Sequence, residues 1–444
     1  MKMMGKRGPP RSSREIRDVF GKYFAENGYK FVASSPVLPR SKQEQKDLIF
    51  VNAGMYQFKD RLMNKGETHW NLEKAYNWQP CIRVGGKHND LAHVGRDGIH
   101  LTLFHMLGNW CFDELVWPNW QNSRMLQAKQ AAWKTRVTKE AWVLLTKVFC
   151  LPPERFIVTY KGNSDLEYTL TTKLGFPRNR LKPLSWDQGG LWSMGDSGPI
   201  GSTCEFHFVP VHKGEVKLEN AVELWNLVFM SKEFWKPAGK YYYFYQKNLD
   251  TGMGLERITA ILQGVDSIYD TEEFRQLLAS ASQLTGGPEY GGKFGPEADA
   301  DTNLRILVDH SRMAAVALAD GAPIASRGPY QILRKCIHRA AFAAFSLRPA
   351  PAYEPVMPEL ANEALEDLVD YYPKLGPKAA AVREALLAEE KGFLLQLQKG
   401  LDGYARARRK QSDLSPAVHF ASKASLFSDE MIAGIAKFPF LQSS

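Results

Sequence analysis

The stretch YYYFYQKNLDTGMGLERITAIL, residues 241–262, decides the fold class. Aromatic residues come first, Gly252 and Gly254 follow, and an apolar pattern with helical spacing ends the stretch. This order predicts a strand, a glycine turn and a helix that faces back over a sheet. The pattern G-x-G-x-x-R ends in Arg257, where a dinucleotide-binding motif has a third glycine. Two glycines let a ligand approach the backbone, and a cation one helical turn later suits a triphosphate, so the stretch favours ATP over a dinucleotide.

The chain before this stretch is punctuated by glycine and proline, and the chain after it is helical in pattern. Short apolar runs such as RFIVTY (155–160) and FHFVPV (206–211) predict a mainly antiparallel sheet, with a helix at 13–28 beside it. From about residue 266 alanine, leucine and charged residues dominate, and a long helix is expected over 377–410. The expected fold class is therefore α+β, with an antiparallel sheet flanked by helices and then an all-helical domain.

One of these helices has a basic face. In QILRKCIHRAAFAAF, residues 331–345, the apolar residues fall on one side, and Arg334, Lys335, His338 and Arg339 fall on the other. Such a face is either a solvated helix surface or a surface that follows phosphates.

Composition narrows the class of protein. The 444 residues are enough for two or three domains, and the net charge of +9 favours a polyanionic partner such as nucleic acid, or simply a basic protein. No apolar run reaches the roughly 18 residues of a membrane helix, so no membrane partner is expected. Five cysteines without a C-x-x-C pair indicate a reducing compartment. The first fourteen residues contain no acid, which fits an organelle presequence or a flexible basic tail.

A second chemical region spans CIRVGGKHNDLAHVGRDGIHLTLFHMLGNW, residues 81–110. Arg83 ends a short predicted strand, Lys87 follows a Gly-Gly turn, and Phe104 lies on the returning strand. Two antiparallel strands would bring Arg83 and Phe104 to neighbouring positions, where they offer a fork for phosphate or carboxylate and a ring for a base. The GGKH segment is not a P-loop, because His88 stands where that motif has a hydroxyl. The histidines here lack acid or thiol partners at ligand spacing, so no metal site is expected.

An arginine on a strand, an aromatic on its partner and a later G-x-G-x-x-R together resemble motifs two and three of class II aminoacyl-tRNA synthetases. Six stretches in order resemble the alanyl-tRNA synthetase family in particular, over about the first 260 residues. They are FVNAGMYQFKD (50–60), CIRVGGKHNDLAHVG (81–95), MLGNW (106–110), LWSMGDSGPIG (191–201), LWNLVFM (224–230) and DTGMGLERI (250–258). Similarity continues more weakly through ILVDHSRMAAVALADG and ILRKCIHRA.

The resemblance implies activation of alanine by ATP, with Mg²⁺, and transfer of alanine to the 3′ end of tRNA(Ala). It implies that Arg83 bridges the α-phosphate and the substrate carboxylate, Asp250 pairs with the ammonium of alanine, and Arg257 holds the γ-phosphate; these are the expected catalytic residues. The implied ATP-binding residues are Arg83, Lys87, His100, Phe104, Gly252, Gly254 and Arg257. The implied alanine-binding residues are Trp192, Asn226, Val228 and Asp250, and the expected tRNA-binding residues are Arg327, Arg334, Lys335, His338 and Arg339.

Three departures from the family pattern keep an alternative open. His105 stands where the family has glutamate, MGDSGPIGSTCE lacks a cysteine pair, and SRGPYQILRK (326–335) lacks the asparagine expected to read the acceptor stem. His105, together with a C-terminus that ends near residue 444, favours a catalytically inactive, synthetase-derived RNA-binding protein. Retention of Arg83, Asp250 and Arg257 favours an active enzyme. A divergent basic form fits the mitochondrial matrix better than the cytoplasm.

The expected domains are a basic tail (1–14), a catalytic domain (15–265), a helical domain that binds the tRNA acceptor stem (266–410) and a C-terminal tail (411–444). The 444 residues contain no H-x-x-x-H pattern and no Cys/His set like that of an editing domain. We therefore expect mischarging with serine that the chain does not correct. The sequence leaves the oligomeric state open and is compatible with a monomer.

Overall fold

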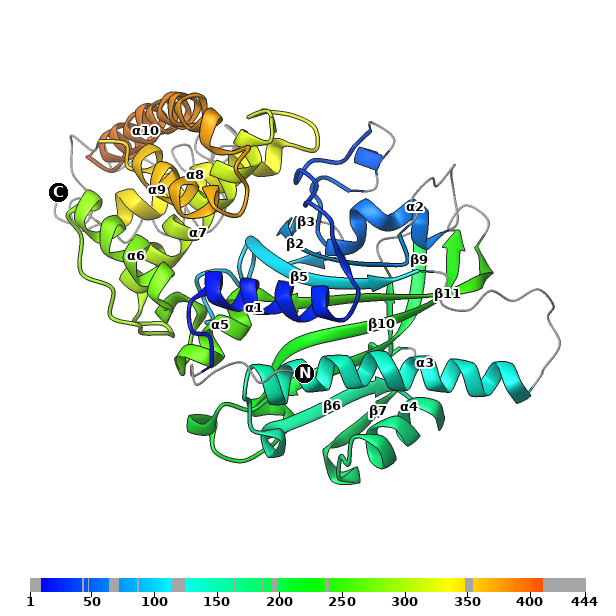
Figure 1. Cartoon of the computed structure of the whole chain (residues 1–444). Coiled ribbons are helices and arrows are strands. Elements are labelled where there is room, and N and C mark those ends of the chain that lie inside the picture. The colour runs from blue at the N-terminus through cyan, green and yellow to red at the C-terminus, as the bar shows by residue number, and fades with distance from the viewer. Residues whose placement is uncertain are drawn as a thin grey trace. The chain divides into compact units, whose positions relative to one another are not determined.

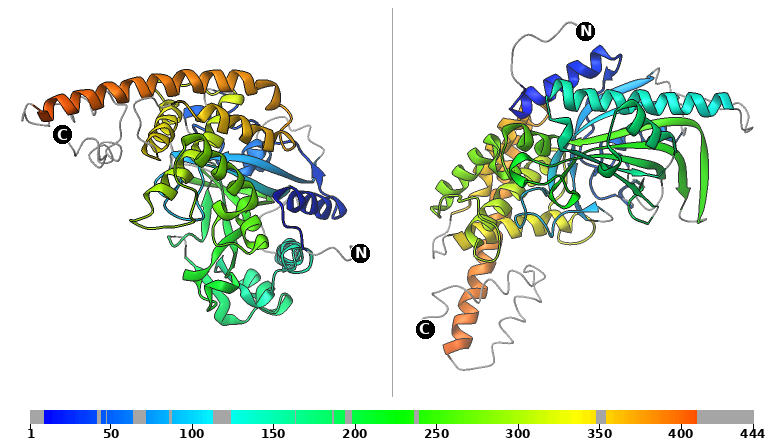
Figure 2. Two further views of the ribbon diagram at one scale, coloured as in Figure 1. Left: turned by 90° about the vertical axis from the view of Figure 1, so that its left-hand side faces the viewer. Right: turned by 90° about the horizontal axis from the view of Figure 1, so that it is seen from below.

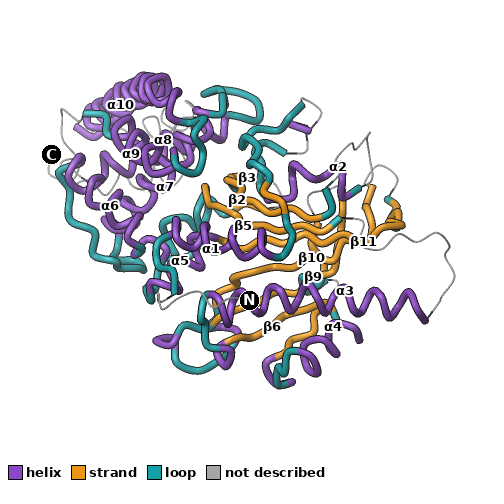
Figure 3. The backbone as a smooth tube through the Cα atoms, in the orientation of Figure 1, coloured by secondary structure: helices purple, strands orange, loops and turns teal. Residues whose placement is uncertain are grey.

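The structure is a computed structural model, which describes residues 9–41, 44–46, 48–63, 72–85, 88–112, 124–162, 164–185, 187–193, 198–235, 239–347 and 354–409. Internal contacts divide the chain into two units. The sheet unit comprises residues 1–81 and 104–268, and the helical unit comprises residues 82–103 and 269–444. Figure 3 shows that strands are concentrated in the first unit and helices in the second.

The sheet unit is built on one large sheet with the order β1-β2-β5-β11-β10-β9-β6-β7, and β8 pairs with β9. The pairs β1–β2 and β6–β7 are parallel, and the central pairs from β5 to β6 are antiparallel. This confirms the predicted α+β fold with a mainly antiparallel sheet. The strands are β1 (Lys30–Phe31), β2 (Lys74–Ile82), β5 (Leu103–Cys111), β6 (Phe156–Lys161), β7 (Leu181–Leu184), β8 (Leu191–Ser193), β9 (Gly198–Phe208), β10 (Val222–Trp235) and β11 (Lys240–Gly254).

Helices cover one face of this sheet. Figure 1 shows α1 (Ser13–Glu26) and α3 (Arg124–Val143) crossing the same side of it, and the right-hand view in Figure 2 agrees. Phe20 and Phe24 of α1 pack on Trp225, and Trp133 of α3 packs on Phe229. The short helices α2 (Lys59–Leu62), α4 (Ser164–Tyr168) and α5 (Leu255–Gln263) complete the unit.

Local sequence explains how α1 begins. Ser12 accepts a hydrogen bond from the Glu15 backbone N–H at 3.2 Å, and the Glu15 carboxylate accepts one from the Ser12 N–H at 3.3 Å. This capping box satisfies two N–H groups that the helix leaves unbonded.

The predicted glycine turn at residues 252–254 is wrong, because β11 continues through Gly254 and α5 begins at the next residue. A Cβ atom at Gly252 would lie 2.6 Å from the sulfur of Met106 on β5. Glycine at 252 therefore serves close packing between paired strands rather than a turn.

The helical unit contains α6 (Glu272–Thr285), α7 (Asp299–Ala319), α8 (Gln331–Leu347), α9 (Met357–Val369) and α10 (Ala379–Arg409). The last of these confirms the predicted long helix. The unit also contains the hairpin of β3 (Val84–Gly85) and β4 (His88–Asn89), so residues 82–103 group with the helices and not with the expected domain of residues 15–265. Among the described residues, none of the helices is both long and apolar enough to cross a membrane.

Candidate active site

The face of the sheet opposite α1 and α3 carries the predicted substrate residues of the sheet unit. Val228 pairs with Asp250 and Asn226 pairs with Gly252 across β10 and β11, and directly paired residues point to the same side. On β5, Met106 pairs with Gly254, and Phe104 lies on the same side because side chains alternate along a strand. Both β5 side chains are half-buried, as expected of a face open to a ligand.

Asp250 is a buried carboxylate, with only 6% of its surface exposed. The indole N–H of Trp110 donates to its Oδ1 at 2.6 Å. Burial raises the pKa of Asp250 to about 7, against the opposing effect of the Trp110 hydrogen bond. A buried carboxylate of this kind is suited to hold a cation such as an ammonium.

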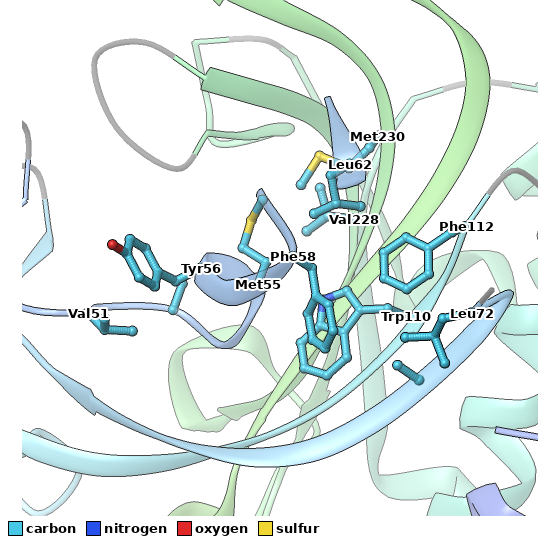
Figure 4. Close-up of a cluster of buried hydrophobic side chains, with 12 residues drawn as sticks. Val51, Met55, Tyr56, Phe58, Leu62, Leu72, Trp110, Phe112, Val228 and Met230 are labelled. Carbon is cyan, nitrogen blue, oxygen red and sulfur yellow. The ribbon is translucent and has the colours of Figure 1, made fainter. Parts of the chain in front are cut away.

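A hydrophobic cluster adjoins Asp250 and includes its paired residue Val228. Figure 4 shows Val228, Trp110 and Phe58 gathered in it, and Trp192 packs against the cluster from β8. Trp192 pairs with Gly201, where a Cβ atom would lie 2.7 Å from a methyl carbon of Val228. Glycine at 201 therefore lets β8 and β9 approach Val228, and an apolar wall forms beside the carboxylate.

Asn226 adds a polar group to this face. Its side-chain amide donates to Glu205 at 3.1 Å, and its carbonyl oxygen is buried without a hydrogen-bond partner in the described part of the chain. Glu205 in turn accepts from the Thr159 hydroxyl at 2.7 Å. Glu205 thus fixes the orientation of the Asn226 side chain, and the Asn226 carbonyl oxygen can accept a hydrogen bond from a ligand N–H.

Arg257 lies on α5, three residues beyond Gly254. Its guanidinium donates to the Glu223 backbone carbonyl at 3.1 Å and lies 3.6 Å from the Glu223 carboxylate. A Cβ atom added at Gly254 would lie 3.5 Å from the Arg257 side chain, an ordinary contact. Glycine at 254 is therefore not required by crowding within the protein, and a ligand can approach the backbone there.

His105 points away from the substrate face. It is 2% exposed, its Nδ1 lies 2.7 Å from a carboxylate oxygen of Glu256, and its backbone N–H donates to both oxygens of that group. At position 105, where glutamate was expected, the chain therefore has a histidine that binds the Glu256 carboxylate on α5. This pair joins β5 to the residue next to Arg257.

Two other expected ATP-site residues, Arg83 and His100, belong to the helical unit, and Lys87 lies outside the described residues. The Arg83 backbone N–H donates to the Thr102 carbonyl at 2.9 Å, which places Arg83 opposite a residue two positions before Phe104. His100 Nδ1 lies 2.7 Å from Asp97. Burial acts to raise the pKa of Asp97, but the hydrogen bonds from His100 and Ile99 hold it below its ordinary value.

The expected tRNA-binding residues do not form one exposed surface. Arg327 and Lys335 are exposed, whereas His338 is buried, stacks on Phe393 and lies 2.6 Å from Glu389. Arg334 donates to the same carboxylate at 2.6 Å. Arg339 donates to the Leu91 carbonyl at 3.2 Å. The basic face of α8 is therefore only partly exposed, because α10 contacts Arg334 and His338 while Arg339 bonds to the loop at Leu91.

Sequence reasoning missed Trp110, Glu205 and Glu223 as partners of the predicted residues. Each partner lies on a different element from the residue that it orients. Two of them were within quoted segments, Trp110 in MLGNW and Glu205 in MGDSGPIGSTCE. Within the described ranges, no three His, Cys, Asp or Glu residues gather as metal ligands.

A mainly antiparallel sheet with these residues on its central strands, followed by helices, is the fold of class II tRNA synthetases. The model of the family described as tRNA synthetases class II (A) matches residues 15–427, and the chain belongs to this family. It is 35% identical to the mitochondrial alanine–tRNA ligase of Mus musculus over 92% of this chain. It is 34% identical to the alanine–tRNA ligase of Chlorobaculum tepidum over 88%, and 35% identical to the cytoplasmic enzyme of Dictyostelium discoideum over 89%. The matched region spans 41% or 42% of the length of these relatives.

Proposed function

We propose that the chain activates alanine with ATP to alanyl-adenylate and transfers alanine to the 3′ end of tRNA(Ala). The single observation that carries the proposal is the buried Asp250 carboxylate on one face with Val228, Asn226 and Gly252. This arrangement suits a small amino acid, because a carboxylate binds the ammonium while an apolar wall leaves room for a methyl group. The similarity to alanine–tRNA ligases supports the same choice.

In the proposed reaction an oxygen of the alanine carboxylate attacks the α-phosphorus of ATP, and pyrophosphate leaves. Asp250 holds the ammonium, which orients the carboxylate for attack. Arg83 neutralises charge at the α-phosphate, and Arg257 binds the γ-phosphate that departs with pyrophosphate. Phe104 stacks on the adenine, while Gly252 and Gly254 let the nucleotide approach β11. Mg²⁺ enters as part of the ATP substrate and neutralises phosphate charge.

The proposed tRNA site uses the exposed Arg327 and Lys335, with Arg334 at its edge. His338 and Arg339 hold the helical unit together beneath it. We place the protein in the mitochondrial matrix, because the relatives include mitochondrial enzymes and the chain is basic. Cell fractionation tests this placement, and recovery in the cytosol alone refutes it.

Alanine-dependent exchange between pyrophosphate and ATP tests the proposed activity. The parent chain is expected to show exchange with alanine, weaker exchange with serine and glycine, and none without an amino acid. Asp250→Asn and Arg257→Gln should reduce it at least about a hundredfold. The matched exposed changes Asp187→Asn and Arg178→Gln should leave it unchanged. A folded parent chain that binds tRNA but shows no exchange would instead be the inactive RNA-binding protein.

A further inference from the structure

Helix α7 contacts the loop of residues 83–102, which joins β2 to β5 and carries the expected ATP-site residues Arg83, Lys87 and His100. Arg305, fully buried, donates from Nε to the Gly95 carbonyl at 2.8 Å. A Cβ atom at Gly95 would lie 2.6 Å from Ile306, so the loop packs tightly against the helix. All of these residues belong to the helical unit.

Two further residues on the same side of α7 contact the end of the loop. Asp309 accepts from the Thr102 backbone N–H at 2.8 Å and from the Thr102 hydroxyl. Arg312 donates to the Leu103 carbonyl at 3.3 Å. Spacings of four and three residues put Arg305, Asp309 and Arg312 on one face of a helix, so one face of α7 serves the loop.

A chain of hydrogen bonds extends from the buried Asp309 to the half-buried Arg339 on α8. His310 Nδ1 lies 2.8 Å from Asp309 Oδ2, His310 Nε2 lies 3.2 Å from a guanidinium nitrogen of Arg339, and that nitrogen also donates to the Leu91 carbonyl at 3.2 Å. Asp309 and His310 are both 0% exposed. A carboxylate only accepts and a guanidinium only donates. His310 is therefore neutral with its proton on Nδ1, and each bond in the chain has one direction.

This chain of hydrogen bonds reaches Arg83 in two steps. Asp309 holds both the N–H and the hydroxyl of Thr102, and the Thr102 carbonyl accepts from the Arg83 N–H at 2.9 Å. At the other end, Arg339 holds Leu91 within the same loop. Two helices thus hold the loop at separate points, the buried Asp309 at Thr102 and the half-buried Arg339 at Leu91.

We propose that Asp309, with His310 and Arg339, positions Arg83 for catalysis. Activation of alanine by ATP would then require α7 and α8 before any tRNA is bound. The inference rests on the proposed function of the chain. It assigns to the helical unit a part in the chemistry of adenylate formation, in addition to any part in binding tRNA.

The test compares Asp309→Asn, Arg339→Gln and Arg339→Lys in the full chain by alanine-dependent pyrophosphate exchange without tRNA. Asp309→Asn and Arg339→Gln are expected to raise the KM for ATP on the order of tenfold and to lower kcat, because a displaced loop misplaces its ligands. Arg339→Lys retains a donor and should recover part of the loss. The matched change Asp299→Asn, at the exposed start of α7, should behave as the parent chain. A smaller fraction of folded protein would lower kcat and leave the KM for ATP unchanged. That result for Asp309→Asn and Arg339→Gln would overturn the proposal.

Hydrogen exchange separates failure of this inference from failure of the proposed function. If the parent chain shows no alanine-dependent pyrophosphate exchange, the proposed function fails. The contacts of the loop are then tested by hydrogen exchange alone. Backbone N–H groups of residues 91–103 should then exchange faster in Asp309→Asn than in Asp299→Asn. Equal protection in the two variants would overturn the role of Asp309.

Discussion

The indole nitrogen of Trp110 and the carboxylate oxygen of Asp250 lie 2.6 Å apart in the interior of the sheet unit. The N–H group stabilises the ionised carboxylate, while the surrounding protein destabilises it. Burial has the larger effect, and the pKa of Asp250 is raised to about 7. A substrate ammonium would tip this balance towards the ionised form, so alanine binding should respond to small changes in pH.

The KM for alanine should rise as the pH falls from 8 to 6. Below its pKa of about 7, Asp250 is protonated in the free protein and offers no charge to the ammonium. The rise should approach about tenfold per pH unit at the acidic end. Exchange kinetics at varied alanine and saturating ATP measure it. A KM for alanine that is constant over this range would contradict the assignment of Asp250.

Trp110→Phe should move this pH dependence to higher pH. The change removes the donor that lowers the pKa of Asp250, so the carboxylate will be protonated at a higher pH than in the parent chain. At pH 7.5 the KM for alanine should rise severalfold. Trp78→Phe on β2 is the matched control and should keep the parent profile. A shift of the profile towards acidic pH would show that Trp110 acts in another way.

Asp250→Asn should stabilise the fold at pH 8 while removing activity. The folded pKa lies above the unfolded value, so the folded protein binds more protons between about pH 4 and 7, and its stability falls as the pH rises through that window. The side-chain amide introduced by Asp250→Asn does not ionise, so the variant does not lose this stability as the pH rises. The free energy of unfolding at pH 8 should rise by about 1 to 4 kcal/mol, and much less at pH 4. Denaturant unfolding beside the exposed control Asp187→Asn measures the difference, and a destabilised variant at pH 8 would refute it.

Alanine substitutions at Gly252 and Gly254 should have different effects. A Cβ atom at Gly252 meets the Met106 sulfur at 2.6 Å, and that sulfur also accepts from the Gly54 N–H at 3.2 Å, so Gly252→Ala should lower the melting temperature. Gly254→Ala meets nothing closer than 3.5 Å and should melt normally. If ATP lies against Gly254, its KM should rise severalfold. Normal melting with an unchanged KM for ATP would remove Gly254 from the ATP site.

Glu390 in α10 should make the helical unit less stable at alkaline pH. It is fully buried, and burial raises its pKa to about 8 although it accepts from the Val356 and Met357 N–H groups. Because this value lies above the ordinary one, stability should fall as the pH rises from about 4.5 to 8. Glu390→Gln should flatten that decline in the melting temperature. The exposed Glu384→Gln on the same helix should not, and equal slopes in both variants would contradict the assignment.

Sequence reasoning succeeded where structure follows from local pattern. The helix that begins after Ser12 and the long helix α10 follow from caps and from periodicity within one segment. The helix that follows Gly254 is predicted in the same way from the apolar spacing after the glycines. These features depend on neighbours in the sequence, so a single sequence contains enough information to predict them.

Features set by distant segments could not be predicted in this way. Whether Gly252 forms a turn or a strand depends on Met106, and whether the basic side of α8 is exposed depends on Glu389 and Phe393 of α10. Likewise, the grouping of residues 82–103 with the helices depends on α7, more than 200 positions along the chain, as the contact between Thr102 and Asp309 shows. Periodicity identifies a face but not the segment that covers it.

The unbroken course of β11 into α5 sets the distance between the sites proposed for the two substrates. Asp250 and Gly254 are four residues apart on a continuous strand, which at roughly 3.3 Å per residue separates the proposed ammonium site from the proposed nucleotide contact by about 13 Å. Inserting a single residue between them would lengthen this distance and also turn one of the two sites to the opposite side of the sheet. A change in the length of this segment should therefore disrupt both proposed sites, whichever residue is inserted.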